Sequence, residues 1–460
     1  MSYTPAVPLY TQPTFLGKDE VSMVTEERVT SKPTRRLRVG VIGIGVGGLE
    51  IIRAMVQQPD ILDLYAGCDV VPLTRERFKE RFPEAKVYDN VDALCSDPDL
   101  EAVYIASPNR FHAEHAITAA RHGKHVLVEK PMAISLKETE QMVEECEKAG
   151  VQLICAHTAS YGTDYRTMRK IIQSGELGRV RAIQMISYTD WMLRPRTPDE
   201  LDFNQGGGVP FRQGPHQIDT VRLLGGGMIR SVRATIGQWM PERPIPGYYN
   251  ALFEFEDGTA ATVVHNGYGY FLMSEVNGEP QGRSNIANRV RVRREMQAGT
   301  RKEAEDKQDM RIGGVVESSQ FANALTAQDP GYRAGEGGER PREPVDRTGL
   351  NDTGDPGTLI VSCERGDMRV GRGGHVWVYD GDGVHEVRGV SSVHSRGEIH
   401  EMYDAVVNGK PVYHSGRWGM ATAEAIFGMI ESSRQRHEVL LSHQVPMHSE
   451  YDADLEVVRV

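Results

Sequence analysis

Three glycines, spaced as Gly43-x-Gly45-x-x-Gly48, follow a short apolar run and open a helical pattern. Glycine at these positions permits a tight turn, a close approach of the backbone to a phosphate, and close packing of the helix on the strand. The helix N-terminus adds unpaired N–H groups and the positive end of a dipole, and both favour an anion. The pattern therefore predicts a site for the pyrophosphate of a dinucleotide; the alternative is a glycine turn with a structural role alone.

Asp69 ends the next apolar run, 21 residues beyond Gly48. A carboxylate at that place accepts hydrogen bonds from the adenosine ribose and repels a 2′-phosphate. The spacing therefore favours NAD over NADP as the cofactor. Arg75 and Arg77 lie close enough in the sequence to leave NADP open.

The alternation of apolar runs and helical patterns predicts the elements that position these residues. It extends over residues 37–155, is typical of β-α-β units, and predicts a parallel sheet. Lys130 follows the apolar run at 125–128. We therefore expect Lys130 at the carboxyl edge of the sheet, where such folds bind their ligands.

A second sequence pattern begins after residue 160, with longer predicted strands in which apolar and polar residues alternate. Turn sequences such as the one at 256–258 separate these strands as hairpin turns do. They predict an α+β domain over residues 156–460, built on a largely antiparallel sheet. Residues 274–356 are rich in Gly, Arg, Glu and Asp, so we expect a polar insertion that is partly ordered at most. Residues 1–36 carry four prolines and are expected to form an N-terminal arm.

Composition and charge disfavour several classes of function. The 460 residues carry a formal net charge of −11, which is unsuited to general binding of nucleic acid or of an anionic membrane. No apolar run reaches the ~18 residues of a membrane-spanning helix, and the N-terminus lacks the pattern of a secretory signal. The five cysteines are widely spaced, and no histidine or carboxylate cluster has the spacing of metal ligands. We expect a cytoplasmic protein without a metal that acts on a small molecule.

Two stretches are specific enough to indicate a family: residues 102–115, with the sequence AVYIASPNRFHAEH, and residues 123–131, with GKHVLVEKP. A glycine triplet at 206–208 and the pattern G-x-H-x-x-D at 214–219 follow. In order and spacing, these motifs resemble the glucose–fructose oxidoreductase / inositol dehydrogenase (Gfo/Idh/MocA) family of NAD(P)-dependent enzymes. The resemblance covers residues 37–436 apart from the polar insertion.

Within that family, the chain is most similar to the cis-dihydrodiol dehydrogenases of phthalate breakdown. The stretches that carry this similarity are 206–226, 362–365, 402–406 and 414–416. The resemblance implies an α/β Rossmann domain followed by an α+β domain with an open, mostly antiparallel sheet. Because the outer face of that sheet often mediates oligomers in the family, we expect a homo-oligomer, either a dimer or a tetramer.

The resemblance also implies roles for particular residues. Lys130 would reach the reacting hydroxyl, and the peptide bond before Pro131 would often be cis. His216 would be the general base, since a histidine can take the proton that a hydroxyl loses near pH 7. The residues that would line the dinucleotide are Ser107, Asn109, His112 and Glu129.

Arg212 stands where many members of the family have an aspartate, four residues before the histidine. An arginine cannot orient a histidine as an aspartate does, but it can hold a carboxylate through two parallel hydrogen bonds. We therefore expect an acidic substrate; a structural pairing of Arg212 with Asp219 or Glu129 is the alternative. Asp219 and His157 are further candidates for substrate binding. Asp219 follows His216 by three residues, and His157 begins a stretch in which members of the family line the cleft.

These features predict an NAD-dependent dehydrogenase that removes a hydride from a secondary hydroxyl of a carboxylated cis-dihydrodiol of the phthalate type and gives a catechol. A sugar or cyclitol dehydrogenase of the same family is one alternative. An NAD-dependent glycosidase and a cofactor-sensing regulator without catalysis are two others. The presence of Lys130 and His216 argues against the regulator.

Overall fold

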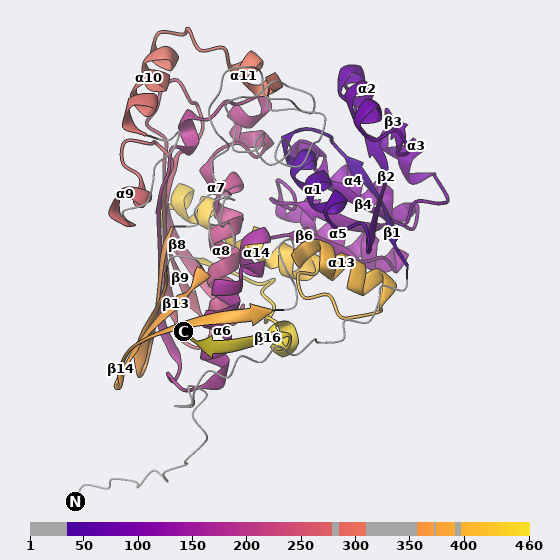
Figure 1. The fold of residues 1–460 in the computed structure, drawn as a ribbon. Helices are drawn as coiled ribbons and strands as arrows, with labels where there is room; N and C mark the ends of the chain where they lie inside the picture. Colours follow the sequence, from indigo (N-terminus) through magenta and orange to yellow (C-terminus); the bar gives the residue numbers. More distant parts are fainter. Residues whose placement is uncertain (1–34, 278–284, 310–356, 372–373, 392–396) are drawn as a thin grey trace, which may run out of the picture.

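The computed structural model describes residues 35–277, 285–309, 357–371, 374–391 and 397–460. The first 34 residues of the expected N-terminal arm and residues 310–356 of the expected insertion lie outside these described residues. Within them, the chain forms two sheets, each with its own helices (Figure 1).

The first sheet consists of six parallel strands in the order β3-β2-β1-β4-β5-β6. These strands are β1 Leu37–Ile42, β2 Leu62–Cys68, β3 Lys86–Tyr88, β4 Ala102–Ile105, β5 His125–Glu129 and β6 Leu153–Ala156. The helices that connect them are α1 Val46–Val56, α2 Pro72–Arg81, α3 Val91–Cys95, α4 His112–Arg121 and α5 Leu136–Ala149. The strand order reverses between β1 and β4, and such sheets bind ligands beyond the carboxyl ends of the strands at this point. The predicted Rossmann domain is confirmed.

Local sequence signals account for these elements. Every residue of β4 is buried, because helices cover both faces of the sheet, and its sequence is apolar throughout. The Ser135 side chain caps α5 by accepting a hydrogen bond from the backbone N–H of Glu138. Gly150 ends the same helix in the left-handed conformation, with φ of 68°.

The second sheet has ten strands in the order β15-β8-β9-β10-β7-β11-β12-β13-β14-β16. These strands are β7 Val180–Tyr188, β8 Ile229–Gly237, β9 Tyr248–Phe255, β10 Ala260–Asn266, β11 Thr358–Cys363, β12 Gly366–Val370, β13 Val376–Asp380, β14 Gly383–Ser391, β15 Val439–Leu440 and β16 Leu455–Arg459. The helices of this part are α6 Thr163–Ser174, α7 Val209–Arg212, α8 Gly214–Leu224, α13 Gly397–Val407 and α14 Gly416–Gln435. Neighbouring strands are antiparallel except for β10 and β7, which are parallel. The predicted open, mostly antiparallel sheet is confirmed.

Two helices from the end of the chain pack on the first sheet, and one of them, α14, also packs on the second. Helix α13 contacts β1, β5 and β6 and buries Ile399, Met402 and Tyr403 in the core of the first sheet. Helix α14 packs against α5 and β6 on one side and against α8 and β8 on the other (Figure 1). From the sequence, residues 156–460 were expected as a whole in the second domain, since a helical pattern does not show which sheet the helix will cover.

The described part of the expected insertion contains the short helices α9 Met273–Asn277, α10 Ile286–Gln297 and α11 Glu303–Asp309. In α10, Val292 and Met296 are buried in the core of the second domain. Glu303, at the start of α11, accepts hydrogen bonds from the Arg243 guanidinium and from the backbone N–H of Arg196, both at 2.6 Å. Residues 285–309 therefore pack on the core through a few apolar and charged contacts.

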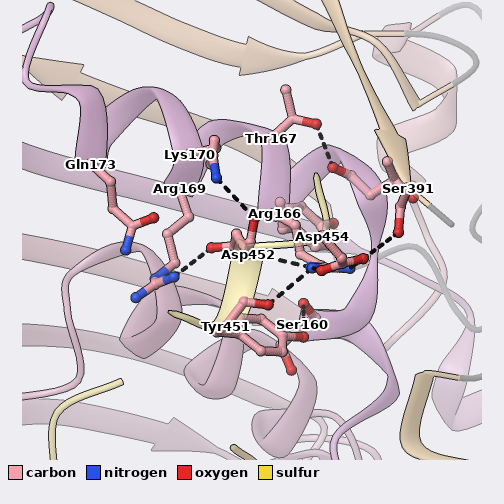
Figure 2. A network of polar contacts seen from close by, with 12 residues as sticks. Ser160, Arg166, Thr167, Arg169, Lys170, Gln173, Ser391, Tyr451, Asp452 and Asp454 are labelled. Carbon is pink, nitrogen blue, oxygen red and sulfur yellow. Dashed lines mark hydrogen bonds and ion pairs between the residues drawn. The ribbon is translucent and has the colours of Figure 1, made fainter. Parts of the chain in front are cut away.

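A network of ion pairs fixes the C-terminal segment to α6 (Figure 2). The carboxylate of Asp452 accepts a hydrogen bond from Arg166 Nε at 3.0 Å and another from Arg169. The carboxylate of Asp454 pairs with Arg166 and accepts a hydrogen bond from Ser391 Oγ at 2.6 Å. Each of the two guanidinium groups therefore faces a carboxylate, and Lys170 donates to the backbone carbonyl of Asp452 at 3.0 Å.

Candidate active site

A cleft of about 420 Å³ lies where the carboxyl ends of the parallel strands face the second domain. On the first side, the predicted residues that line it are Gly43, Gly45, Asp69, Ser107, Asn109, His112, Glu129 and Lys130. On the opposite side, the lining includes Trp191, Arg194, Arg196, Glu200, Arg212, His216 and Lys307. The structure thus brings together in one cleft the residues that the sequence predicted, except Gly48, Asp219 and His157.

The glycine turn after β1 fits a phosphate group. Gly43 has a φ of 87°, and a Cβ atom there would lie 2.7 Å from the backbone nitrogen of Ser107. A Cβ atom on Gly48 would lie 2.1 Å from the carbonyl oxygen of Gly43, so Gly48 lies beneath the turn and allows α1 to pack against it. Gly45 has open space at its Cβ position and lines the cleft. A pyrophosphate can therefore approach the backbone at the N-terminus of α1.

Asp69 connects the end of β2 to the glycine turn. Its carboxylate accepts hydrogen bonds from the backbone N–H groups of Ile44, at 3.0 Å, and Val71, at 2.9 Å. Each carboxylate oxygen has a second lone pair, so the side chain can still accept hydrogen bonds from a ribose. Arg75 donates to the backbone carbonyl of Asp69 at 2.7 Å, and the described lining of the cleft includes neither Arg75 nor Arg77. This arrangement fits NAD better than NADP.

His112 joins two loops beneath the cleft. Its Nδ1 lies 2.8 Å from the carbonyl oxygen of Pro131, and its Nε2 lies 2.8 Å from the carbonyl oxygen of Ser107. Burial lowers the pKa of the His112 ring. The peptide bond between Lys130 and Pro131 is cis, as the resemblance implied. His112 therefore ties the loop after β4 to the loop that carries Lys130.

Lys130, in the first domain, and His216, in the second, lie on opposite sides of the cleft. The Lys130 Nζ donates to the backbone carbonyl of Arg212 at 3.4 Å, and burial lowers the pKa of this lysine. Burial, and then the charge of Lys130, lower the pKa of His216 well below its usual value. Within the described part of the chain, no group hydrogen-bonds the His216 ring, which lines the cleft. A neutral imidazole in this position is able to accept a proton from a bound hydroxyl.

Asp219 and His157 lie behind the cleft, which corrects their expected place at the substrate. Asp219 is fully buried and accepts hydrogen bonds from Trp418 Nε1 at 2.6 Å and Thr422 Oγ1 at 3.2 Å, both in α14. His157 Nδ1 lies 3.4 Å from the same carboxylate, and burial lowers the pKa of His157 to about 4 despite that neighbour. Although His216 and Asp219 share α8, the packing of α8 against α14 directs the Asp219 carboxylate to Trp418 and Thr422, away from the cleft.

Arg212 extends from α7 across the cleft. One guanidinium nitrogen donates to Asn109 Oδ1 at 2.8 Å, and another donates to Glu200 Oε1 at 3.0 Å. The arginine therefore pairs with neither Asp219 nor Glu129, which corrects the structural alternative considered from the sequence. The exposed fraction of its side chain is 28%, so part of the guanidinium remains accessible from the cleft.

Glu200 is surrounded by three cations that all line the cleft. Besides Arg212, Lys307 Nζ lies 2.9 Å from its carboxylate and Arg196 Nη1 lies 3.6 Å from it. Burial raises the pKa of Glu200, but Arg212, Arg196 and Lys307 together outweigh burial and lower this pKa below its usual range. Glu200 is therefore ionised, and three positive charges face one negative charge. We call Arg196, Glu200, Arg212 and Lys307 the cation cluster.

Three members of the cation cluster were not predicted from the sequence. Arg196 and Glu200 lie in the stretch 194–200, whose only sequence signal is a concentration of arginine, proline and carboxylate residues. Arg196 also stacks on Trp191, with Cζ 3.6 Å from the ring centroid. Lys307 lies in the expected polar insertion, where a single lysine resembles any solvated charge.

The described residues contain neither a candidate metal site nor a candidate membrane span. Within them, no group of three or more His, Cys, Asp or Glu side chains is placed to hold a metal ion. No helix of this part of the chain has the length and apolar character needed to cross a membrane.

The sequence of this chain is similar to those of known oxidoreductases. Residues 37–157 match the model of the Gfo/Idh/MocA oxidoreductase family with an NAD-binding Rossmann fold, and residues 165–279 match a Gfo/Idh/MocA C-terminal domain. A 1-carboxy-3-chloro-3,4-dihydroxycyclohexa-1,5-diene dehydrogenase from Comamonas testosteroni is 32% identical over 407 residues, which cover 86% of this chain and 95% of that protein.

Solved structures extend the similarity to the fold. A crystal structure described as that of a dehydrogenase from Bordetella bronchiseptica RB50 has a TM-score of 0.75 and 32% identity, and the match covers 88% of this chain and 100% of that one. A levoglucosan dehydrogenase in complex with NADH and levoglucosan shares the fold at 19% identity, with a TM-score of 0.64 over 88% of this chain and 99% of that one. The chain therefore belongs to the Gfo/Idh/MocA family of oxidoreductases, whose Rossmann fold binds NAD.

Proposed function

We propose that the protein is an NAD-dependent dehydrogenase that oxidises a secondary hydroxyl of a carboxylated cis-dihydrodiol of the phthalate type. The observation that carries this proposal is the cation cluster, in which Arg196, Arg212 and Lys307 pair with a single carboxylate of the described residues, Glu200. Charged groups that are partly withdrawn from water need counter-charges. A carboxylate on the substrate would supply one at this place, whereas a neutral polyol would not.

The residues of the first domain are proposed to hold the cofactor. The turn with Gly43 and Gly45 and the N-terminus of α1 would bind the pyrophosphate, and Asp69 would bind the adenosine ribose. Ser107, Asn109, His112 and Glu129 would line the rest of the dinucleotide. When bound, NAD supplies the hydride acceptor of the reaction.

Lys130 and His216 are proposed to act on the reacting hydroxyl. Lys130 would donate a hydrogen bond to its oxygen, and neutral His216 would accept its proton as the carbonyl forms. The lowered pKa of His216 keeps the ring unprotonated at neutral pH. Oxidation of one hydroxyl of a cis-dihydrodiol gives a hydroxy-dienone, which tautomerises to a catechol, and the gain of aromaticity favours the products.

The Comamonas testosteroni relative supports this substrate class, since its name describes a ring with a carboxyl group and two hydroxyl groups. A sugar or cyclitol dehydrogenase is the second candidate, because a relative from Bacillus subtilis, 27% identical over half of this chain, is a scyllo-inositol 2-dehydrogenase. The cation cluster favours the acidic substrate over the second candidate.

A substrate panel tests the proposal. Purified protein with NAD would be given carboxylated cis-dihydrodiols, the neutral cis-dihydrodiol of benzene, aldoses and cyclitols, and NADH would be followed by its absorbance. We expect kcat/KM to be at least about tenfold higher for the carboxylated diols than for any neutral compound. A neutral sugar or cyclitol as the best substrate would contradict the proposal.

A homo-oligomer, a dimer or a tetramer, is also proposed. Leu252 of β9 and Ile360 of β11 lie in one row across the second sheet, with Thr262 and Gln184 between them. Leu252 is 51% exposed and Ile360 is 38% exposed, so the outer face of this sheet carries uncovered apolar side chains. Light scattering would measure the mass of the assembly, and a monomer at micromolar concentration would contradict this part of the proposal.

A further inference from the structure

Helix α11 brings Lys307 from the expected insertion to the substrate side of the cleft. The ammonium group of Lys307 lies 2.9 Å from one carboxylate oxygen of Glu200 and 3.1 Å from the other. An ammonium group has three N–H donors, so Lys307 can contact Glu200 and a ligand at the same time. The exposed fraction of its side chain is 15%, which is consistent with a lysine directed at a cleft and not at bulk solvent.

The position of Lys307 is fixed by buried contacts one turn earlier in the helix. Glu303 accepts a hydrogen bond from Arg243, whose side chain is 2% exposed, and another from the backbone N–H of Arg196, each at 2.6 Å. Arg243 is held in turn by the carbonyl oxygens of Met192, at 3.0 Å, and Arg194, at 3.1 Å. The same contacts therefore place both Lys307 and Arg196 at the cleft.

The number of charges indicates how many anionic groups the cation cluster accepts. Among the residues that the structure describes, the three cations and Glu200 leave an excess of two positive charges. One substrate carboxylate would leave one of these charges without a partner, and two would neutralise the cluster. Unused donors are present for both, since Arg212 uses two of its five N–H groups on Asn109 and Glu200.

We propose that Lys307 is a specificity-determining residue that binds a second carboxylate of the substrate, while Arg212 binds the first, so that the enzyme selects dicarboxylated over monocarboxylated ligands. The proposal rests on the proposed function, because it takes the carboxylated diol as the substrate. The competing explanation is that the pair of Lys307 and Glu200 only docks α11. A docking role would affect all ligands alike.

Equilibrium binding separates these explanations. Phthalate, with two carboxylates, and benzoate, with one, would be titrated calorimetrically into the NADH-saturated protein. Lys307→Gln should weaken phthalate binding by about 10- to 100-fold, the effect of losing one charge-assisted contact, and benzoate binding by less than about threefold. Lys307→Arg should restore most of the phthalate affinity. Equal losses for the two acids, or no loss for either, would overturn the proposal.

Lys302→Gln is the matched control, because Lys302 precedes the same helix but is 71% exposed and pairs with Glu305. It should change the affinity for neither acid. A measurement on the wild-type protein covers the case in which Lys307→Gln does not fold. Phthalate should bind at least about tenfold more tightly than its monomethyl ester, which retains one carboxylate. Equal affinities for the diacid and the monoester would overturn the proposal.

Turnover assays distinguish this inference from the proposed function. Suppose that the wild-type protein oxidises mono- and dicarboxylated cis-dihydrodiols equally well, and that Lys307→Gln changes neither rate. The proposed function then stands and the role of Lys307 is overturned. Suppose instead that no carboxylated diol is oxidised, but that phthalate binding depends on Lys307. The second-carboxylate subsite is then supported and the proposed substrate is rejected.

Discussion

The arginines of α6 and the arginines of the cleft are both held by carboxylates, but the two clusters differ in the balance of charge. At α6, Arg166 and Arg169 face Asp452 and Asp454, so that two guanidinium groups meet two carboxylates, while Lys170 donates to the backbone carbonyl of Asp452. In the cleft, Arg196, Arg212 and Lys307 share one carboxylate, Glu200, within the described part of the chain. The first cluster is closed within the protein, and it fixes the C-terminal segment (Figure 2).

This difference shows how a structural cluster can be distinguished from a binding cluster. A balanced, buried network satisfies its own donors and contributes to the fold. An unbalanced cluster at a cleft keeps positive charge that an anionic ligand can neutralise. Substitutions in the first cluster should therefore change stability, and substitutions in the cleft should change rates and affinities.

The largest expected effect is on the rate and concerns the proposed acid–base pair. Lys130→Ala and His216→Asn should each lower kcat by about 10²- to 10⁴-fold, because each removes a proposed hydrogen-bond or proton-transfer group. NAD binding should remain nearly unchanged when measured by titration. Lys148→Ala, at an exposed position of α5, is the control and should keep full activity. Full activity in either cleft variant would remove that residue from the mechanism.

The pH profile sharpens this test. Because the pKa of His216 lies well below its usual value, the acidic limb of kcat/KM should fall below pH 6.5 in the wild-type protein. His216→Asn should lack that limb. An acidic limb that persists unchanged in the variant would assign it to another group.

The next largest expected effect is on the free energy of unfolding and concerns the ion pairs between α6 and the C-terminal segment. Asp452→Asn should lower the free energy of unfolding by about 3–5 kcal/mol, because it leaves buried Arg166 and Arg169 without a full counter-charge. Urea denaturation measures this change, and kcat should stay within about threefold of the wild-type value. Arg212→Ala, in the partly exposed cation cluster, should change the free energy of unfolding by about 1 kcal/mol or less. The reverse ranking of the two variants would contradict the distinction between the clusters.

His157, the buried histidine behind the cleft, should make the free energy of unfolding fall in acid. Burial lowers the pKa of His157 to about 4, so the unfolded chain binds its proton more readily than the folded one. The stabilisation is therefore complete above pH 6.5 and is lost as the pH falls toward 4. Between these limits, the free energy of unfolding should fall by up to about 3 kcal/mol more in the wild-type protein than in His157→Asn. An equal fall in the two proteins would contradict this role of His157.

The smallest of these effects concerns the choice of cofactor. Asp69→Ala should reduce the preference for NAD over NADP by about five- to tenfold, because it removes a carboxylate that repels a 2′-phosphate. It should also weaken NAD binding, since the carboxylate holds the N–H of Ile44 in the glycine turn. The ratio of kcat/KM for the two cofactors measures the preference. A wild-type preference for NADP would refute the assignment of Asp69.

Features that depend on neighbouring residues could be predicted from the sequence. The glycine spacing of Gly43, Gly45 and Gly48, and the position of Lys130 after a strand, are local properties, and the structure has the expected turn and strand. The parallel and the antiparallel sheet were predicted in the same way, from the lengths and the alternation of the apolar runs.

Features that depend on how elements dock could not be predicted. Asp219 shares a helix with His216, but the way α8 packs against α14 turns it toward Trp418. Helix α13 lies on the first sheet although more than two hundred residues separate them in the sequence. Lys307 meets Glu200 only because Glu303 anchors α11 by contacts with distant residues. The hydrophobic periodicity of the sequence does not predict such long-range contacts.

The most direct test of the central claim is the substrate dependence of Arg212→Ala. For a carboxylated cis-dihydrodiol, kcat/KM should fall by about 10- to 150-fold relative to the wild-type protein, the effect of losing a charge-assisted contact of about 1.5–3 kcal/mol. For the neutral analogue without the carboxyl group, it should fall by less than about threefold. Arg212→Lys should recover only part of the loss, because an ammonium group cannot match the planar guanidinium. Equal losses on the acidic and the neutral substrate would show that Arg212 is structural and would contradict an anion site in the cleft.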